Sequence, residues 1–122
     1  MGARRDSDTS AELARRRARM DRLNVRLRDL LQQRALLAVA IARWKKARGL
    51  PVADPARERV MLAAMLAAPG PGFEPPALRR LLRAILRESR SAALTAVQDR
   101  ATASRSRTAR PRPAPPRSGT RR

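Results

Sequence analysis

The chain has 122 residues, enough for one modest domain, and its formal net charge of +19 comes almost entirely from arginine. It contains no Cys, His or Tyr, which excludes disulfides, Cys or His metal sites, and the usual Ser-His and Cys-His nucleophile pairs. Any catalysis must therefore use Arg, Lys, Asp, Glu, Ser and backbone groups. A charge of this sign and size is typical of proteins that bind nucleic acid or acidic surfaces.

The first part of the chain predicts one long helix. Residues 1–8 are expected to be disordered, and "TSAE" at 9–12 matches a capping box, in which a hydroxyl caps the helix and a carboxylate follows three residues later. No Pro or Gly interrupts the pattern before Gly49, so the helix is expected to end at Arg48. A helix of this length measures roughly 57 Å.

An apolar stripe with one charge in its middle follows one face of this predicted helix. Its members alternate at steps of four and three, which is the spacing of a buried helix face; they are Leu23, Leu27, Leu30, Arg34, Leu37, Ile41 and Trp44. A compact domain of 100 residues has a radius of gyration of only about 13 Å, so such a helix needs a partner along its length. The sequence therefore predicts an intertwined homodimer, with a kinked or frayed helix in a monomer as the alternative.

Two shorter helices are predicted after a connector at 49–53. Asp54 followed by Pro55 is typical of a helix N-cap and first position, and this helix should end at about Ala67. A loop at 69–76 then leads into a third helix from near Pro76 to about Gln98. Its apolar face is formed by Leu78, Leu81, Leu82, Ile85 and Leu86 and continues through Ser89. Because no strand pattern is visible, the predicted fold class is all-α, with three helices in each protomer.

The C-terminal tail at 99–122 differs in composition from the predicted domain at 9–98. It contains eight Arg and one Asp together with Pro and Ser, and such a composition is expected to remain disordered. Its charge allows weak, salt-sensitive, non-specific binding to nucleic acid. No secretory or membrane segment is evident, so the expected location is the cytoplasm.

Arg34 and Lys45 form the centre of a candidate anion site. They are eleven residues apart, which places them within about 20° of each other on the long helix, and both side chains can reach one ligand. Arg17 lies about 100° away around the same helix and would more naturally serve a neighbouring chain.

The other helices add further polar candidates, which are Asp54, Arg57 and Glu58 at the start of the second helix and Ser89 in the third. Each candidate has a simpler structural explanation when it is taken alone. Arg34 could extend its charge to solvent from a helix edge, Lys45 could suit the helix dipole, and Asp54 could serve as a cap. Ser89 could bond back to its own helix, and Arg17 could be surface charge. The set as a whole favours a site.

Three segments together resemble the all-helical chorismate mutase family over about residues 10–94. "MDRLNVRLRDLLQQRALLAVAIARWKK" is similar to the first helix of that family, although Asn24 stands where an Asp is usual. "LPVADPARERVML" is similar to its connector and Asp-x-x-Arg-Glu motif, and "LLRAILRESR" to its third-helix segment. The resemblance implies a small intertwined dimer that converts chorismate to prephenate by a [3,3] rearrangement, without a cofactor or metal.

The resemblance also implies a role for each matching residue. Arg34, together with Arg17 from the other subunit, would bind the two substrate carboxylates, and Ser89 would help to hold one of them. Lys45 would donate to the ether oxygen and a nearby carboxylate. Asp54 and Glu58 would lie by the ring hydroxyl, with Arg57 beside them. Lys45, Arg34 and Glu58 are the expected catalytic residues.

One residue departs from the family pattern. Ala93 stands four residues after Ser89, where the family usually has a Gln or Glu against the ether oxygen, and Gln98 is too far along the helix to replace it. Losing one preorganised donor typically costs about 10²–10³ in rate, so the expected enzyme is slow unless a partner protein or another side chain completes the site.

Several other functions stay open at this stage. An isochorismate-pyruvate lyase or a 4-amino-4-deoxychorismate mutase would share the fold and the cationic pocket. A weakly active regulatory subunit, which an aromatic-pathway enzyme would stimulate, is compatible with Ala93. A non-enzymatic nucleic-acid-binding protein fits the charge, but one Trp and one Phe offer little surface for stacking on bases.

Overall fold

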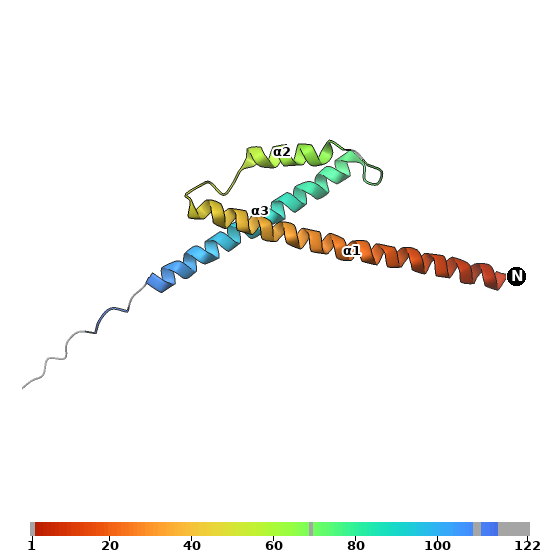
Figure 1. Cartoon of the computed structure of the whole chain (residues 1–122), viewed down its shortest axis with the longest axis horizontal. Coiled ribbons are helices and arrows are strands. Elements are labelled where there is room, and N and C mark those ends of the chain that lie inside the picture. Colours follow the sequence, from red (N-terminus) through yellow and green to blue (C-terminus); the bar gives the residue numbers. More distant parts are fainter. Residues whose placement is uncertain (1, 69, 109–110, 115–122) are drawn as a thin grey trace, which may run out of the picture.

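The computed structural model describes residues 2–68, 70–108 and 111–114. Within them the chain forms three α-helices and no strand, which confirms the predicted all-α class; the helices are α1 (Gly2–Ala47), α2 (Pro55–Leu66) and α3 (Pro75–Thr108). Figure 1 shows α3 crossing α1, with α2 above them, and the N-terminal half of α1 projecting away from both. No helix in this part of the chain has the length and apolar character needed to cross a membrane.

The long helix α1 begins earlier than the sequence predicts. It starts at Gly2, so residues 2–8 are helical where disorder was expected. The Thr9 hydroxyl donates to the carbonyl of Arg5 at 2.8 Å instead of capping a helix start. Glu12 forms ion pairs one turn ahead with arginines of the same helix. The capping-box residues therefore stabilise the interior of a helix, where their side chains find partners.

The third helix also extends beyond its predicted end near Gln98. It continues to Thr108, so the helical structure includes residues 99–108 of the segment that was expected to be disordered. No Pro or Gly interrupts this stretch, and hydroxyls such as that of Thr102 donate to carbonyls four residues earlier. Residues 111–114 have no regular structure, and the rest of the predicted tail lies outside the described residues.

Small side chains form the contact between α1 and α3. The least exposed apolar positions on α1 are Ala35, Ala38, Val39 and Ala42, which recur at helical spacing on one face. The residues that are buried on α3 are Leu86, Ser89 and Ala93, also on one face. Because alanines let two helix backbones approach closely, this contact forms the centre of the protomer.

The apolar stripe of α1 is a different face, and it is uncovered in a single chain. Leu23, Leu27 and Leu30 are 54%, 55% and 61% exposed, and Leu37, Ile41 and Trp44 are exposed as well. Exposed apolar surface of this extent is typical of a protein–protein contact. The apolar side chains of the stripe, which the sequence predicts to be buried, therefore remain exposed within the protomer.

Helix α2 begins as the sequence predicts. Asp54 is its N-cap and its Oδ1 accepts a hydrogen bond from the backbone N–H of Arg57 at 3.0 Å, while Pro55 occupies the first position. The helix packs against α3. Its first turn and the connector before it lie opposite the C-terminal third of α1.

Candidate active site

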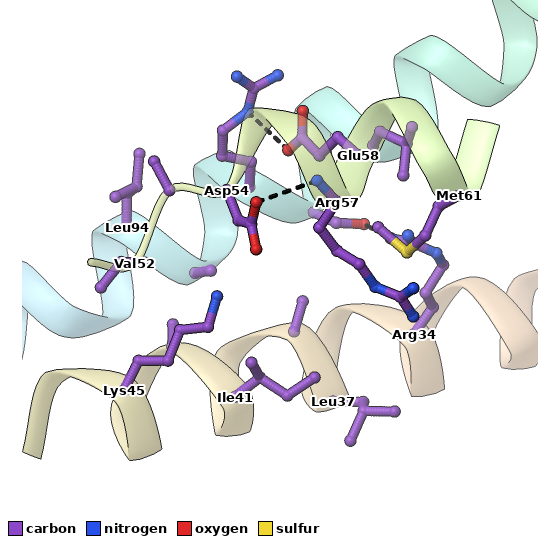
Figure 2. Close-up of a pocket in the computed structure, with 17 residues that line it drawn as sticks. Arg34, Leu37, Ile41, Lys45, Val52, Asp54, Arg57, Glu58, Met61 and Leu94 are labelled. Atoms are coloured by element: carbon purple, nitrogen blue, oxygen red, sulfur yellow. Dashed lines mark hydrogen bonds and ion pairs between the residues drawn. The ribbon is translucent and has the colours of Figure 1, made fainter. Parts of the chain in front are cut away.

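A cavity of about 590 Å³ lies between the three helices and contains most of the candidate residues. Arg34 and Lys45 come from α1, Asp54, Arg57 and Glu58 from the start of α2, and Ser89 and Ala93 from α3. Figure 2 shows Arg34 and Lys45 rising from α1, and Asp54 and Arg57 extending from the start of α2, toward the space between these helices. Glu58 lies on the other side of α2, near α3. The remaining wall is mostly apolar and is formed by Leu37, Ala38, Ile41, Ala42, Val52, Ala53, Met61, Leu86 and Leu94.

Arg34 and Ser89 form a polar pair at one end of the cavity. The Arg34 Nη1 group donates a hydrogen bond of 2.7 Å to the hydroxyl oxygen of Ser89, which is only 8% exposed. A guanidinium has five N–H donors, so most of them remain for a ligand, and the hydroxyl proton of Ser89 can also be donated. Ser89 therefore bonds to Arg34 across the fold, and the pair can bind a carboxylate.

Lys45 lies along the same face of α1 as Arg34, as their spacing predicts, and both side chains line the cavity. Figure 2 shows the Lys45 side chain rising from α1 toward Asp54 at the N-terminus of α2. Asp54 uses one carboxylate oxygen to cap α2. A ligand between α1 and α2 would therefore meet an ammonium donor from one side and a carboxylate acceptor from the other.

Glu58 pairs with Arg90, a cavity residue that the sequence analysis missed. The Arg90 Nε lies 3.4 Å from the Glu58 Oε1, and this ion pair links α2 to α3. In the sequence, nothing distinguishes Arg90 from Arg83 or Arg87 on the same helix. Its role depends on where α2 packs, which only the tertiary structure provides.

The charges that line the cavity leave an excess of two positive charges. The cations are Arg34, Lys45, Arg57 and Arg90, and the carboxylates are Asp54 and Glu58. A cleft lined by such an excess of one charge favours a ligand with two negative charges. The mostly apolar wall suits the ring or carbon skeleton of such a ligand.

Ala93 is a wall residue of the same cavity. It is 6% exposed and lies one helical turn after Ser89 on α3. Ala93 therefore lies on the same face of α3 as Ser89, toward the cavity. A methyl group faces the ligand space where a longer side chain could place a hydrogen-bond donor.

Arg17 is not near this cavity in the single chain. It is an exposed residue in the projecting half of α1 and lies 17 positions before Arg34, about 26 Å along the helix axis. No side chain crosses that distance within one protomer. A contribution of Arg17 to a site would require a second chain.

Fold and cavity together define a small all-helical protein with a cationic pocket suited to a dianionic small molecule. The sequence model of the family described as chorismate mutase type II matches residues 16–93, well over half of the chain. The protein therefore belongs to the chorismate mutase type II family. A search among curated proteins finds no match.

Proposed function

We propose that the protein is a chorismate mutase that converts chorismate to prephenate. This proposal rests on the observation that Arg34, Ser89 and Lys45 line one cavity in a chain that belongs to this family. The reaction is an intramolecular rearrangement in which one C–O bond breaks and one C–C bond forms. It needs no nucleophile, so a chain without Cys or His can perform it.

Binding of the two carboxylates would lower the entropic part of the barrier. The Arg34–Ser89 pair binds one carboxylate, and a second cation binds the other while the apolar wall encloses the ring. Holding both ends selects the compact, chair-like conformer from a flexible dianion before the reaction begins. The excess of two cavity cations supports a substrate of this charge.

Lys45 would act on the transition state itself. As the C–O bond breaks, negative charge grows on the ether oxygen, and an ammonium group fixed beside it binds the transition state more tightly than the substrate. Arg34 sets the position of the substrate relative to this donor. In our proposal Lys45 and Arg34 are therefore catalytic residues.

The carboxylates at the start of α2 favour chorismate among related substrates. Asp54 and Glu58 can accept a hydrogen bond from a ring hydroxyl, and Arg57 lies beside them in the cavity wall. In 4-amino-4-deoxychorismate, an amine replaces this hydroxyl and could pair with the same carboxylates. Isochorismate carries its hydroxyl at another position and would eliminate pyruvate in a lyase.

We further propose a homodimer in which Arg17 completes the partner's cavity. The uncovered leucine stripe on α1 supports this arrangement, because a second copy of the same helix would bury it. The projecting half of α1, which includes Arg17, is long enough to reach another protomer.

The test is to incubate the full-length protein separately with chorismate, isochorismate and 4-amino-4-deoxychorismate and to identify the products. We expect prephenate from chorismate. Arg34→Ala should lower kcat/KM by at least about 10²-fold, because it removes a charged donor that would bind the substrate carboxylate.

Arg83→Ala provides the matched control for this experiment. Arg83 is an exposed arginine on α3 that does not line the cavity, so its loss should leave turnover unchanged. Unchanged activity of Arg34→Ala would disprove the site assignment. Pyruvate release from isochorismate without prephenate formation would instead identify a lyase in the same cavity.

A further inference from the structure

A second cleft, of about 340 Å³, lies where the C-terminal end of α1 meets the later part of α3. Its cations are Arg43 and Lys46 from α1 and Arg100 from α3, and Ser104 adds a hydroxyl. Figure 1 shows α3 passing this end of α1 on its way to Thr108. The cleft shares no lining residue with the larger cavity.

Charge in the second cleft is unbalanced. No Asp or Glu lines it, and none of the ion pairs among the described residues involves Arg43, Lys46 or Arg100. Asp99 precedes Arg100 in the chain but does not line the cleft. Three cations that share a small volume repel each other, and a bound anion would relieve this repulsion.

The end of helix α1 explains only part of this arrangement. Lys46 lies in the last turn of α1, where a cation interacts favourably with the helix dipole. The helix dipole does not explain the position of Arg100, because this residue lies well before the end of α3 at Thr108. Its guanidinium joins the other two cations because α3 crosses α1 at this point.

The wall of the cleft gives the size and character of a ligand. Ala47, Val97 and Ala101 contribute apolar surface, and the three cations and the Ser104 hydroxyl contribute polar groups. The volume is near the lower end of small-molecule sites, which bury an apolar body and orient it with a few polar groups. Such a site fits a small organic anion.

The α3 side of this cleft lies outside the part of the chain that defines the family. The family match ends at residue 93, whereas the α3 residues of the cleft begin at Val97. The α3 part of the cleft therefore belongs to a segment that the family match does not include. A function of the cleft would be an addition to the chemistry of the larger cavity.

We propose that the second cleft is a binding site for a small anion that carries a phosphate or a carboxylate group. Arg43, Lys46 and Arg100 bind the anionic group, and Ser104 donates one hydrogen bond to it. This proposal does not depend on the reaction in the larger cavity.

The test measures thermal stability of the full-length protein during titration with inorganic phosphate or with benzoate, at ionic strength matched with potassium chloride. An anion that binds only the folded state, at a free concentration of about five times its Kd, should raise Tm by roughly 4–8 °C above the chloride control. A rise with phosphate alone identifies a phosphate site, and a rise with benzoate alone identifies a carboxylate site. No rise with either anion overturns the proposal.

The variant Arg43→Gln/Arg100→Gln should lose this rise in Tm. Its matched control is Arg105→Gln/Arg107→Gln, which removes the same charge from α3 outside the cleft and should keep the rise. Arg34→Ala should also keep it, which excludes binding in the larger cavity. A rise that survives in the first variant, or that disappears equally in the control, contradicts the proposal.

A second variant tests the proposal independently of any loss of stability in the double variant. Ala101→Leu retains every charge and fills part of the cleft, so it should weaken the binding of benzoate at least tenfold in a calorimetric titration. Unchanged affinity in this variant would show that the anion binds elsewhere.

Discussion

At the scale of single residues, Ala93 stands where the resemblance to the family leads us to expect a Gln or Glu. Its methyl group lines the cavity one turn after Ser89, so the wall lacks a donor there. Lys45 is left as the donor for the ether oxygen in the proposed reaction. The cavity of about 590 Å³ has room for a longer side chain at this position.

Replacing Ala93 by Gln should accelerate the proposed reaction. The amide would add a second donor near the ether oxygen, and such a donor can raise kcat by up to about 10²–10³-fold. Steady-state kinetics with chorismate measure the change. Because Ala93 is buried, the free energy of unfolding of the variant must be measured beside its activity.

Ala92→Gln is the control for that substitution. Ala92 is the neighbouring residue on α3, is exposed, and does not line the cavity, so the same change there should leave kcat/KM unaltered. If Ala93→Gln folds normally but is no faster, position 93 does not face the ether oxygen.

At the scale of elements, α1 has two apolar faces with different sizes of side chain. Alanines and Val39 pack closely on α3 within the protomer, whereas the leucine stripe is exposed. One helix can therefore serve two contacts at once. The projecting half of α1, which includes Arg17, contributes no residue to the protomer's own cavity.

Mixing two inactive variants tests whether α1 completes a cavity in a second chain. Arg17→Ala and Arg34→Ala should each be nearly inactive alone. In a mixed dimer, one of the two cavities would contain both arginines, and random pairing of equal amounts makes half of the dimers mixed. Refolding the two variants together should thus restore about one quarter of wild-type activity.

The same experiment has a clear negative outcome. If the co-refolded mixture is no more active than the separate variants, Arg17 does not act across an interface. Sedimentation of the wild-type chain provides the matching readout, since a monomer at assay concentration would contradict the proposed homodimer directly.

At the scale of the whole molecule, positive charge is distributed well beyond the candidate site. Residues 99–122 alone hold eight Arg and one Asp, which contribute +7 to the formal net charge of +19. The family match at 16–93 does not include this segment. Electrostatic attraction to polyanions and the proposed mutase activity are thus expected to be separable.

Removing residues 109–122 should weaken non-specific binding to DNA without changing the turnover of chorismate. The deletion removes five arginines, and each lost phosphate contact should reduce the slope of log K against log[salt] by about 0.9. Fluorescence anisotropy at several salt concentrations measures this slope. An unchanged slope would mean that cations elsewhere in the chain bind the DNA.

Much of the fold was predictable because its signals are local. Asp54-Pro55 correctly marks the start of α2, and the spacing of Arg34 and Lys45 places both on the cavity side of α1. The N-terminus of α1 and the C-terminus of α3 were predicted wrongly. Thr9 suggests a cap in sequence, but the same hydroxyl can bond inside a helix, and which bond forms depends on the residues before it.

The sequence by itself determined the three helices, the residue types available for catalysis and the common face of Arg34 and Lys45, because periodicity and capping act between near neighbours. Only the tertiary structure decided that Ser89 bonds to Arg34, that Arg90 pairs with Glu58, and that a second cationic cleft exists. These contacts join helices that are far apart in the chain. Their geometry depends on how α3 crosses α1 and packs on α2, which no local pattern encodes.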